Sequence, residues 1–149
     1  MKQVKEIMSR DIIRLDPDME IGKAARILLD NRINGAPVVD ETDRILGILC
    51  QSDLITAQKK FPIPSVFTLL DGLIPLRSQK HVEKELHKMA AATVKEAMTK
   101  KPICVSPEST VEEAATLMVE KSFHTLPVIS DNKLVGILGK EDILRLVAG

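Results

Sequence analysis

Aromatic side chains are nearly absent from this 149-residue chain, which has no tryptophan, no tyrosine and three phenylalanines. Proteins that bind single-stranded nucleic acid stack the bases on aromatic rings, so this scarcity removes their usual contact surface. An excess charge of either sign is missing as well, because 21 basic residues balance 21 acidic ones. A balanced chain has no electrostatic footprint for nucleic acid or an anionic membrane. We therefore expect neither as a partner.

Cysteines and long apolar runs are also scarce. Cys50 and Cys104 have no C-x-x-C spacing, and the first residues do not form a signal peptide. These features favour a reducing compartment over a disulfide-bonded secreted protein. The longest apolar stretch, residues 61–76, is interrupted by three prolines and an aspartate, so it is too broken to span a bilayer. The sequence therefore predicts a cytoplasmic protein without a membrane segment.

Motifs of catalysis are missing too. The sequence has no H-E-x-x-H metal motif, no C-x-x-C pair and no G-x-S-x-G nucleophile motif. The run from Gly136 to Glu141 looks like a phosphate-binding loop only superficially, because it lacks the glycine spacing and the Ser or Thr after lysine that such a loop needs. We therefore predict that the chain is not an enzyme and requires no cofactor or metal.

A long internal repeat is the main positive feature. V-K-E-I-M at residues 4–8 returns as V-K-E-A-M at 94–98, and G-I-L-C-Q-S-D at 47–53 returns as G-I-L-G-K-E-D at 136–142. Self-similarity over about fifty residues indicates a duplicated structural unit. The repeat divides the chain into a first unit (1–58), an apolar and helical connector (59–92) and a second unit (93–149).

Each repeat has the same local pattern. A short β-rich run comes first, then a proline turn, an amphipathic helix, two aliphatic strands around a polar turn, and a helix beginning near Ser52 or Glu141. A β-α-β-β-α unit of this size cannot bury its own sheet, so we expect an α/β (α+β) fold of two units whose sheets pack about a pseudo-twofold axis with flanking helices. The β-rich runs are 12–15 and 103–105; the apolar helix positions are Ile21, Ala24, Ala25, Leu28 and Leu29, then Val111, Ala114, Ala115, Met118 and Val119; the hairpin strands are 36–39, 45–49, 126–129 and 134–138.

This pattern resembles a tandem pair of CBS domains, a module first named from cystathionine beta-synthase and often called a Bateman module. The resemblance rests on the turns at Pro17 and Pro107, the Ala-Ala helices, the aliphatic-Pro-Val strands and the paired G-I-L-x-x-x-D closures. In that family, adenine nucleotides or adenosyl compounds such as S-adenosylmethionine bind in clefts between the units. The resemblance implies a regulatory module that binds AMP, ADP, ATP or S-adenosylmethionine and signals to an effector protein, which the sequence does not identify.

The repeated aspartates, Asp53 and Asp142, are the residues that this resemblance assigns to the ribose hydroxyls. An ionised carboxylate can accept two hydrogen bonds from a cis-diol. A purely structural role is also open, because aspartate in the first turn of a helix complements the helix dipole. The resemblance adds further ligand-binding positions, which are Ile13, Asn34, Gly35, Ala36 and Pro37 in the first repeat, and Ile103, His124, Thr125, Leu126 and Pro127 in the second. Lys140 joins them as a cation near the start of the last helix.

Phosphate recognition departs from the family pattern. Nucleotide-binding relatives often have a His-Arg pair before the aliphatic-Pro strand, whereas this chain has His124-Thr125 in one repeat and Asn34-Gly35 in the other. These departures weaken phosphate binding. Because the second repeat keeps an imidazole and a hydroxyl, and Lys140 adds a cation, we expect a phosphorylated ligand to prefer the cleft of Asp142.

The connector allows two interpretations. Residues 61–76 are more apolar than a loop should be, and residues 82–91 then have the pattern of a charged helix. The segment could fold over its own module, or it could expose a patch to a second subunit or an effector. In the resembled family two modules often form a flat homodimer, which makes a homodimer the favoured partner. The alternative function is a ligand-free structural or dimerisation module.

Overall fold

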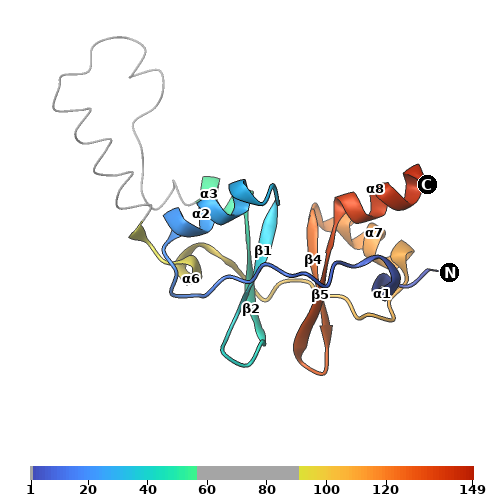
Figure 1. The fold of residues 1–149 in the computed structure, drawn as a ribbon, viewed down its shortest axis with the longest axis horizontal. Helices are drawn as coiled ribbons and strands as arrows, with labels where there is room; N and C mark the ends of the chain where they lie inside the picture. The colour runs from blue at the N-terminus through green and yellow to red at the C-terminus, as the bar shows by residue number, and fades with distance from the viewer. Residues whose placement is uncertain (1, 57–90) are drawn as a thin grey trace, which may run out of the picture.

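The computed structural model describes residues 2–56 and 91–149, and Figure 1 shows their fold. Most of the connector expected at 59–92 therefore lies outside the described residues. The elements of the first half are α1 (Val4–Ile7), α2 (Ile21–Asp30), β1 (Gly35–Val39), β2 (Ile45–Cys50) and α3 (Gln51–Thr56). Those of the second half are α6 (Val94–Ala97), β3 (Thr99–Lys100), α7 (Val111–Lys121), β4 (Thr125–Ser130), β5 (Lys133–Gly139) and α8 (Lys140–Ala148).

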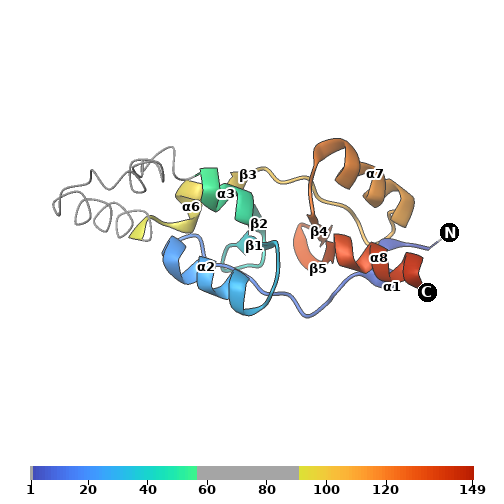
Figure 2. The ribbon, with the colours of Figure 1, turned by 90° about the horizontal axis from the view of Figure 1, so that it is seen from above.

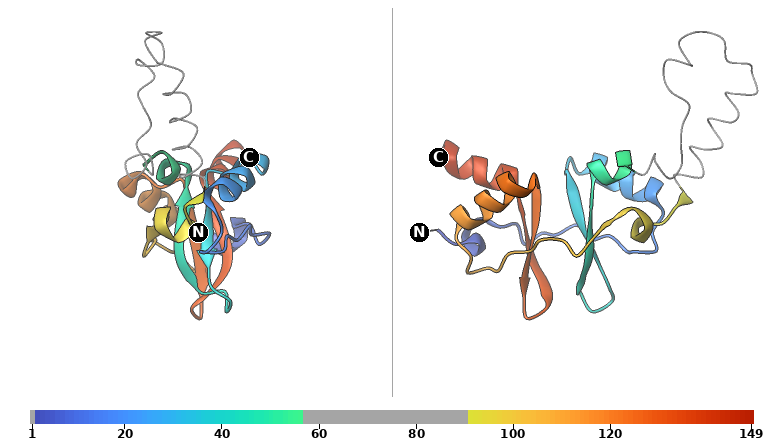
Figure 3. Two further views of the ribbon diagram at one scale, coloured as in Figure 1. Left: turned by 90° about the vertical axis from the view of Figure 1, so that its left-hand side faces the viewer. Right: turned by 180° about the vertical axis from the view of Figure 1, so that it is seen from behind.

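Two antiparallel hairpins form the centre of the molecule. β1 pairs with β2 and β4 pairs with β5, and each hairpin has one irregularity at the same place, after Val38 and after Val128. In Figures 1 and 2 the hairpins lie side by side, with α2 and α3 beside one and α7 and α8 beside the other. Figure 3 shows the same two-part arrangement from behind. The mixed α+β fold of two similar units is thus confirmed.

The strands expected at 12–15 and 103–105 are reduced to single bridges, and this corrects the sequence expectation. Only Leu15 pairs with Val38, and only Val105 with Val128, both in parallel. The reason is that this segment crosses between the units. Ser9 still exchanges two backbone hydrogen bonds of 2.9 Å with Ile137 of the second unit, so the few residues that follow must cross over before the chain can pair with β1.

The short helices at the start of each repeat are exchanged between the two cores. The amide of Val4 donates to Ser109 O and the amide of Val94 donates to Met19 O, each at 2.8 Å. Both valines are fully buried, each in the core of the other repeat. One core contains Val4, Val105, Ala114, Met118, Leu126, Val128 and Leu138, and the other contains Leu15, Ala24, Leu28, Ala36, Val38, Leu49 and Val94.

This exchange explains the glycine of each G-I-L-x-x-x-D sequence. A Cβ on Gly47 would lie 2.6 Å from Thr99 O and 2.7 Å from Met98 Sδ, and a Cβ on Gly136 would meet Met8 Sδ. The exchanged segment thus packs directly on the strand backbone, where no side chain fits. The following Leu49 and Leu138 are fully buried core residues.

The amphipathic helices form as expected, with two corrections. Ile21, Ala24 and Leu28 of α2 are buried, as are their counterparts in α7, but Leu29 is 69% exposed and Val119 is 80% exposed. The predicted apolar faces are therefore too wide by one position. The capping box of α7 is made by Thr110 and Glu113, although Ser109 and Glu112, one residue earlier, have the same capping-box spacing in the sequence.

Candidate functional site

Asp53 and Asp142 occupy equivalent places at the starts of α3 and α8. Each accepts a hydrogen bond from the backbone amide three residues earlier, Asp53 Oδ2 from Cys50 N at 2.7 Å and Asp142 Oδ2 from Gly139 N at 2.8 Å. This is the reaching-back half of a capping box. The structural role considered for these residues is therefore real in both repeats.

The second carboxylate oxygens have different partners. Asp53 Oδ1 accepts a hydrogen bond of 2.9 Å from the hydroxyl of Thr99, in a part-buried site. Asp142 Oδ1 instead lies 3.0 Å from Arg145 Nη1, whose side chain is 76% exposed. An exposed ion pair contributes little stability and is easily rearranged. Of the two aspartates, Asp142 is the one whose oxygen can exchange its partner for a ligand.

A pocket of about 210 Å³ opens beside Asp142. Its walls come from the crossing segment after α1, from β1, and from the end of β5 with the start of α8, so both repeats contribute. Isoleucine side chains provide the apolar surface, and amide, hydroxyl and carboxylate groups provide the polar one. The lining residues are Ser9, Asp11, Ile12, Ile13, Ile33, Asn34, Gly35, Pro37, Thr125, Ile137, Gly139, Glu141, Asp142 and Arg145.

The equivalent cleft on the other side is closed. Its remnant encloses no volume that a water molecule could enter, and it is lined by Ile48, Pro102, Ile103, Phe123, Thr125 and Pro127. The two clefts differ in side-chain size at two equivalent positions, of which Phe123 lines the remnant. Phe123 stands where the open pocket has Ile33, and Cys50 stands where it has Gly139.

The register of the first hairpin places the Cys50 thiol beside Gly35. Cys50 is paired with Gly35 across the first hairpin, whereas Gly139 is paired with Thr125 across the second. A Cβ on Gly35 would lie 2.9 Å from Cys50 Sγ, so the thiol occupies that space. At Gly139 a Cβ would have no neighbour closer than 3.5 Å. The mouth of the Asp142 pocket is open because glycine leaves it so.

The residues expected at the site are distributed unevenly. Six of them line the open pocket together: Ile13, Asn34, Gly35, Pro37, Thr125 and Asp142. Asn34 and Gly35 therefore line the pocket of Asp142, although Gly35 pairs with Cys50 and Asn34 O accepts from the Gln51 amide in their own repeat. Ile103 and Pro127, with Thr125 again, line the closed cleft. Five line neither cavity: Ala36 and Leu126 are buried in the core, His124 and Lys140 are exposed, and Asp53 is bonded to Thr99.

Several lining residues were missed by the sequence reasoning. Ser9 and Asp11 lie in the crossing segment, and Glu141 and Arg145 lie beside the aspartate. A signal for Ser9 was present, because the repeated V-K-E-x-M is followed by Ser9 in one copy and Thr99 in the other. The two hydroxyls lie at equivalent places, and Thr99 reaches the aspartate of its cleft.

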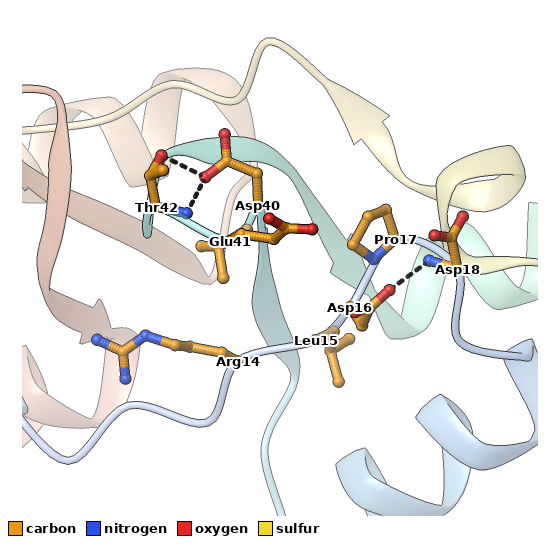
Figure 4. Close-up of a pocket in the computed structure, with 9 residues that line it drawn as sticks. Arg14, Leu15, Asp16, Pro17, Asp18, Asp40, Glu41 and Thr42 are labelled. Atoms are coloured by element: carbon orange, nitrogen blue, oxygen red, sulfur yellow. Dashed lines mark hydrogen bonds between the residues drawn. The ribbon is translucent and has the colours of Figure 1, made fainter.

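A larger hollow of about 520 Å³ lies on the surface around the β1–β2 turn, and Figure 4 shows its residues. Its carboxylates are engaged in the local turns. Asp40 Oδ1 accepts from the amide and the hydroxyl of Thr42, both at 2.8 Å, and Asp16 Oδ1 accepts from the amide of Asp18 at 2.7 Å. Hydrogen bonds from Thr42 and from the Arg44 amide hold the pKa of Asp40 below its usual value. This hollow is a consequence of turn structure.

Metal and thiol chemistry have little support among residues 2–56 and 91–149. No cluster of His, Cys, Asp or Glu in these residues could hold a metal ion. Burial, with a smaller contribution from the Asp53 carboxylate, raises the pKa of the Cys50 thiol to about 11. Burial also raises the pKa of Cys104. A thiol with a raised pKa is a poor nucleophile near neutral pH.

Among the helices of residues 2–56 and 91–149, none has the length and apolar character needed to cross a membrane.

The described residues form two paired units, each a hairpin with flanking helices, with exchanged short helices and a cleft at their junction. The family model described as CBS domain matches residues 4–60 and 94–149. The chain belongs to the CBS domain family, and it carries two copies of the domain.

The relatives of known sequence differ in how much of their own length this chain covers. The uncharacterized protein MJ1426 of Methanocaldococcus jannaschii is 28% identical over 152 residues, covering 95% of this chain and 89% of the relative. The CBS domain-containing protein CBSX1 of Arabidopsis thaliana is 30% identical over 156 residues, covering 95% of this chain and 62% of the relative. Inosine-5'-monophosphate dehydrogenase of M. jannaschii is 29% identical over 146 residues, covering 97% and 23%. The chain thus spans less than two thirds of the last two.

Solved structures have the same fold. CBSX2 in complex with AMP matches with a TM-score of 0.74 and 23% identity, covering 99% of this chain and 97% of that one. The CBS domain pair of MJ0100, in complex with 5'-methylthioadenosine and S-adenosylmethionine, matches with a TM-score of 0.70 and 27% identity, covering 98% and 99%. These matches confirm the fold expected from the repeat.

Proposed function

We propose that this chain is a regulatory module that binds one adenosyl ligand in the Asp142 pocket and transmits its occupancy to a partner protein. The observation that carries the proposal is the pocket itself, in which apolar walls from one repeat meet a carboxylate from the other. Two structural neighbours hold AMP, or 5'-methylthioadenosine and S-adenosylmethionine. These adenosyl compounds share an apolar ring and a ribose diol, which fit this combination of surfaces.

The roles of individual residues follow from their chemistry. Ile12 and Ile13 offer apolar surface to an adenine ring, and Asn34 and Thr125 offer hydrogen-bonding groups near it. Asp142 accepts hydrogen bonds from the ribose hydroxyls once Arg145 moves aside. The pocket is smaller than the usual 300–1,000 Å³ of small-molecule sites, so the part of the ligand beyond the ribose extends toward solvent.

A ligand in this pocket would contact both units at once. The crossing segment from Ser9 to Ile13 comes from the exchanged α1 region, and its neighbours in the pocket belong to β1 and to the start of α8. A ligand shifts a conformational equilibrium only through different affinities for the two states. A site at the junction of two units provides such a difference, since any relative movement of the units changes its shape.

We propose a homodimer as the assembled form. Among the described residues, large apolar side chains are exposed on α2, α3, α7 and α8, and Figure 1 places these four helices along one side of the molecule, opposite the hairpin turns. Ile55 is 68% and Val147 is 79% exposed there. A second copy would cover them. Size-exclusion chromatography with light scattering should report a dimer at micromolar concentration. The double variant Ile55→Lys with Val147→Lys should be a monomer. A monomeric native chain would contradict this assembly.

The alternative is a structural module whose clefts stay empty, and a thermal-shift experiment separates the two. A ligand that binds only the native state raises the midpoint progressively with its concentration. We expect such a rise with at least one compound among adenosine, AMP, ATP and S-adenosylmethionine. No response to any of them would favour the structural module. The cytoplasmic location and the absence of catalysis stay predictions.

Matched substitutions test the site. Asp142→Asn should weaken binding of the responsive adenosyl compound by about 1.5–3 kcal/mol, the range for hydrogen bonds to charged groups. Asp53→Asn makes the same chemical change at the closed cleft and should leave the affinity unaltered. Calorimetric titration measures both, and indifference to Asp142→Asn would return this residue to a helix-capping role alone.

A further inference from the structure

The Asp142 pocket carries an excess of negative charge. Three carboxylates line it, those of Asp11, Glu141 and Asp142, against one guanidinium, that of Arg145. The guanidinium is already 3.0 Å from Asp142 Oδ1. Asp11 and Glu141 therefore have no compensating cation among the lining residues.

The cations that the sequence brings near do not reach the pocket. His124 and Lys140 are exposed, and neither lines it. Two backbone amides at the start of α8 are already bonded, because Gly139 N donates to Asp142 Oδ2 at 2.8 Å and Lys140 N donates to His124 O at 3.0 Å. Free amides at a helix start are what usually hold a phosphate. The first two here are already bonded.

Two of the carboxylates face the same edge of the pocket. A Cβ placed on Gly139 would lie 3.5 Å from Glu141 Oε2 and 3.7 Å from Asp142 Oδ2. Both groups thus flank the open space that glycine leaves at the mouth. A ligand that extends from the ribose toward solvent passes beside them.

This charge belongs to the open pocket alone. In the other repeat, Lys101 stands at the place of Asp11 and Ser52 at the place of Glu141. The two carboxylates are therefore not a property of the duplicated unit. They accompany the one cleft that has room for a ligand.

We propose that the Asp142 pocket selects adenosyl compounds that carry positive charge, or none, next to the ribose, and discriminates against phosphorylated ones. The inference rests on the proposed function and specifies its ligand class. A sulfonium with an ammonium group, as in S-adenosylmethionine, is attracted by Asp11 and Glu141. A phosphate at the same position is repelled by both, since like charges at short range repel one another. Both carboxylates are exposed, so this repulsion is sensitive to salt.

Calorimetric titration of the full chain with S-adenosylmethionine, adenosine, AMP and ATP tests this proposal. At low salt we expect affinity to fall in that order, with S-adenosylmethionine at least tenfold tighter than AMP. High salt should reduce this ratio, because screening shortens the range of the charges. Binding by AMP as tight as or tighter than that of adenosine overturns the charge selection but leaves the adenosyl site in place. No binding by any of the four overturns the proposed function itself.

A charge-neutral variant identifies the groups responsible. Glu141→Gln with Asp11→Asn should lower the ratio of S-adenosylmethionine to AMP affinity at least fivefold. Glu108→Gln, an exposed carboxylate outside the pocket, is the matched control and should leave the ratio as it is. Equal ratios in the native chain and the pocket variant would overturn the assignment. Circular dichroism and the unfolding midpoint confirm that both variants are folded.

Discussion

Thr99 Oγ1 donates a 2.9 Å hydrogen bond to Asp53 Oδ1, joining the start of the second repeat to the end of the first. The equivalent hydroxyl in the other cleft, that of Ser9, lies 3.4 Å from Asp11 O and makes no such link to Asp142 in the described structure. One aspartate is thus tied into the fold and the other faces a pocket. The same residue type at the same place in the repeat has two different environments.

The first prediction concerns this bond. Thr99→Val removes the hydroxyl and keeps the shape, so it should lower the free energy of unfolding by about 1.5–3 kcal/mol, the range for a hydrogen bond to a charged partner. Urea denaturation provides the measurement. Ser9→Ala is the comparison and should cost less than about 1 kcal/mol, because its long contact is to a carbonyl. Equal losses in the two variants would mean that the Asp53 link contributes nothing special.

The second prediction introduces at Gly139 the cysteine that stands at the equivalent position, Cys50, of the other repeat. Gly139→Cys places a thiol at the mouth, and a Cβ there meets nothing nearer than 3.5 Å, so the fold should tolerate it. We expect at least a tenfold loss of adenosyl affinity by calorimetry. The unfolding midpoint should change little. Gly139→Ala adds only the Cβ, so its adenosyl affinity should lie between those of the native chain and Gly139→Cys. Full affinity in Gly139→Cys would contradict the role of glycine at the pocket mouth.

The third prediction tests the exchanged segments. Gly47→Ala should destabilise the protein by about 1–3 kcal/mol, the usual cost of overpacking, because its Cβ would lie 2.6 Å from the backbone oxygen of Thr99. Gly22→Ala is the control, an exposed position in α2, and should be neutral or stabilising by up to about 1 kcal/mol. Chemical denaturation of both variants gives the comparison. A neutral Gly47→Ala would contradict the close packing of Thr99 on β2.

The fourth prediction concerns the pH dependence of stability. The pKa of the Cys50 thiol is raised from 9.0 to about 11, so between these values the native chain holds a proton that the unfolded chain releases. The protonated Cys50 thiol therefore makes its full contribution to the free energy of unfolding below pH 9, and this contribution is lost as the pH rises toward 11. Cys50→Ala should show a shallower loss of stability over this range in urea titrations. A loss identical to that of the native chain would contradict the raised pKa.

The thiol should also react slowly. At neutral pH, a thiol whose pKa is two units higher has about one-hundredth of the thiolate population of an unshifted thiol. The thiolate is the form that reacts. Alkylation of the native protein, followed by mass spectrometry of the peptide that contains Cys50, should be at least tenfold slower than in urea. Equal rates in the two conditions would show that the thiol is accessible and unshifted.

Much of the fold could be read from short-range patterns. The buried positions Ile21, Ala24 and Leu28 of α2 follow the helical period, and the aliphatic runs around residues 40–44 form the hairpin they predict. The pattern extended too far at Leu29, which is exposed, because periodicity identifies an apolar face without saying how much of it a neighbour covers. Within the described residues, α2 has no neighbour on that side that buries Leu29.

The candidate site was half predictable. The sequence singled out Asp142, Ile13 and Asn34, and all three line the pocket. The repeat marks Ser9 as the counterpart of Thr99, but the sequence could not place Ser9 or Glu141 at the pocket, because their places depend on where the crossing segment and the first turn of α8 come together. It also grouped His124 with the site through the family resemblance and Lys140 through its place near the helix start, whereas both residues are exposed and line neither cavity.

The sequence by itself determined the duplication, the α+β composition of each unit and the aspartate at the start of each last helix. These depend on local periodicity and on helix-end chemistry, which neighbouring residues decide. Only the tertiary structure decided that the first helices are exchanged and that one cleft is open. The exchange depends on contacts between segments far apart in the chain, such as Val4 N with Ser109 O. The difference between the clefts depends on side chains that meet across strands, Cys50 against Gly35 in one hairpin and Gly139 against Thr125 in the other. Phe123 in place of Ile33 and Cys50 in place of Gly139 distinguish the closed cleft from the open one, and a packed junction is sensitive to side-chain volume.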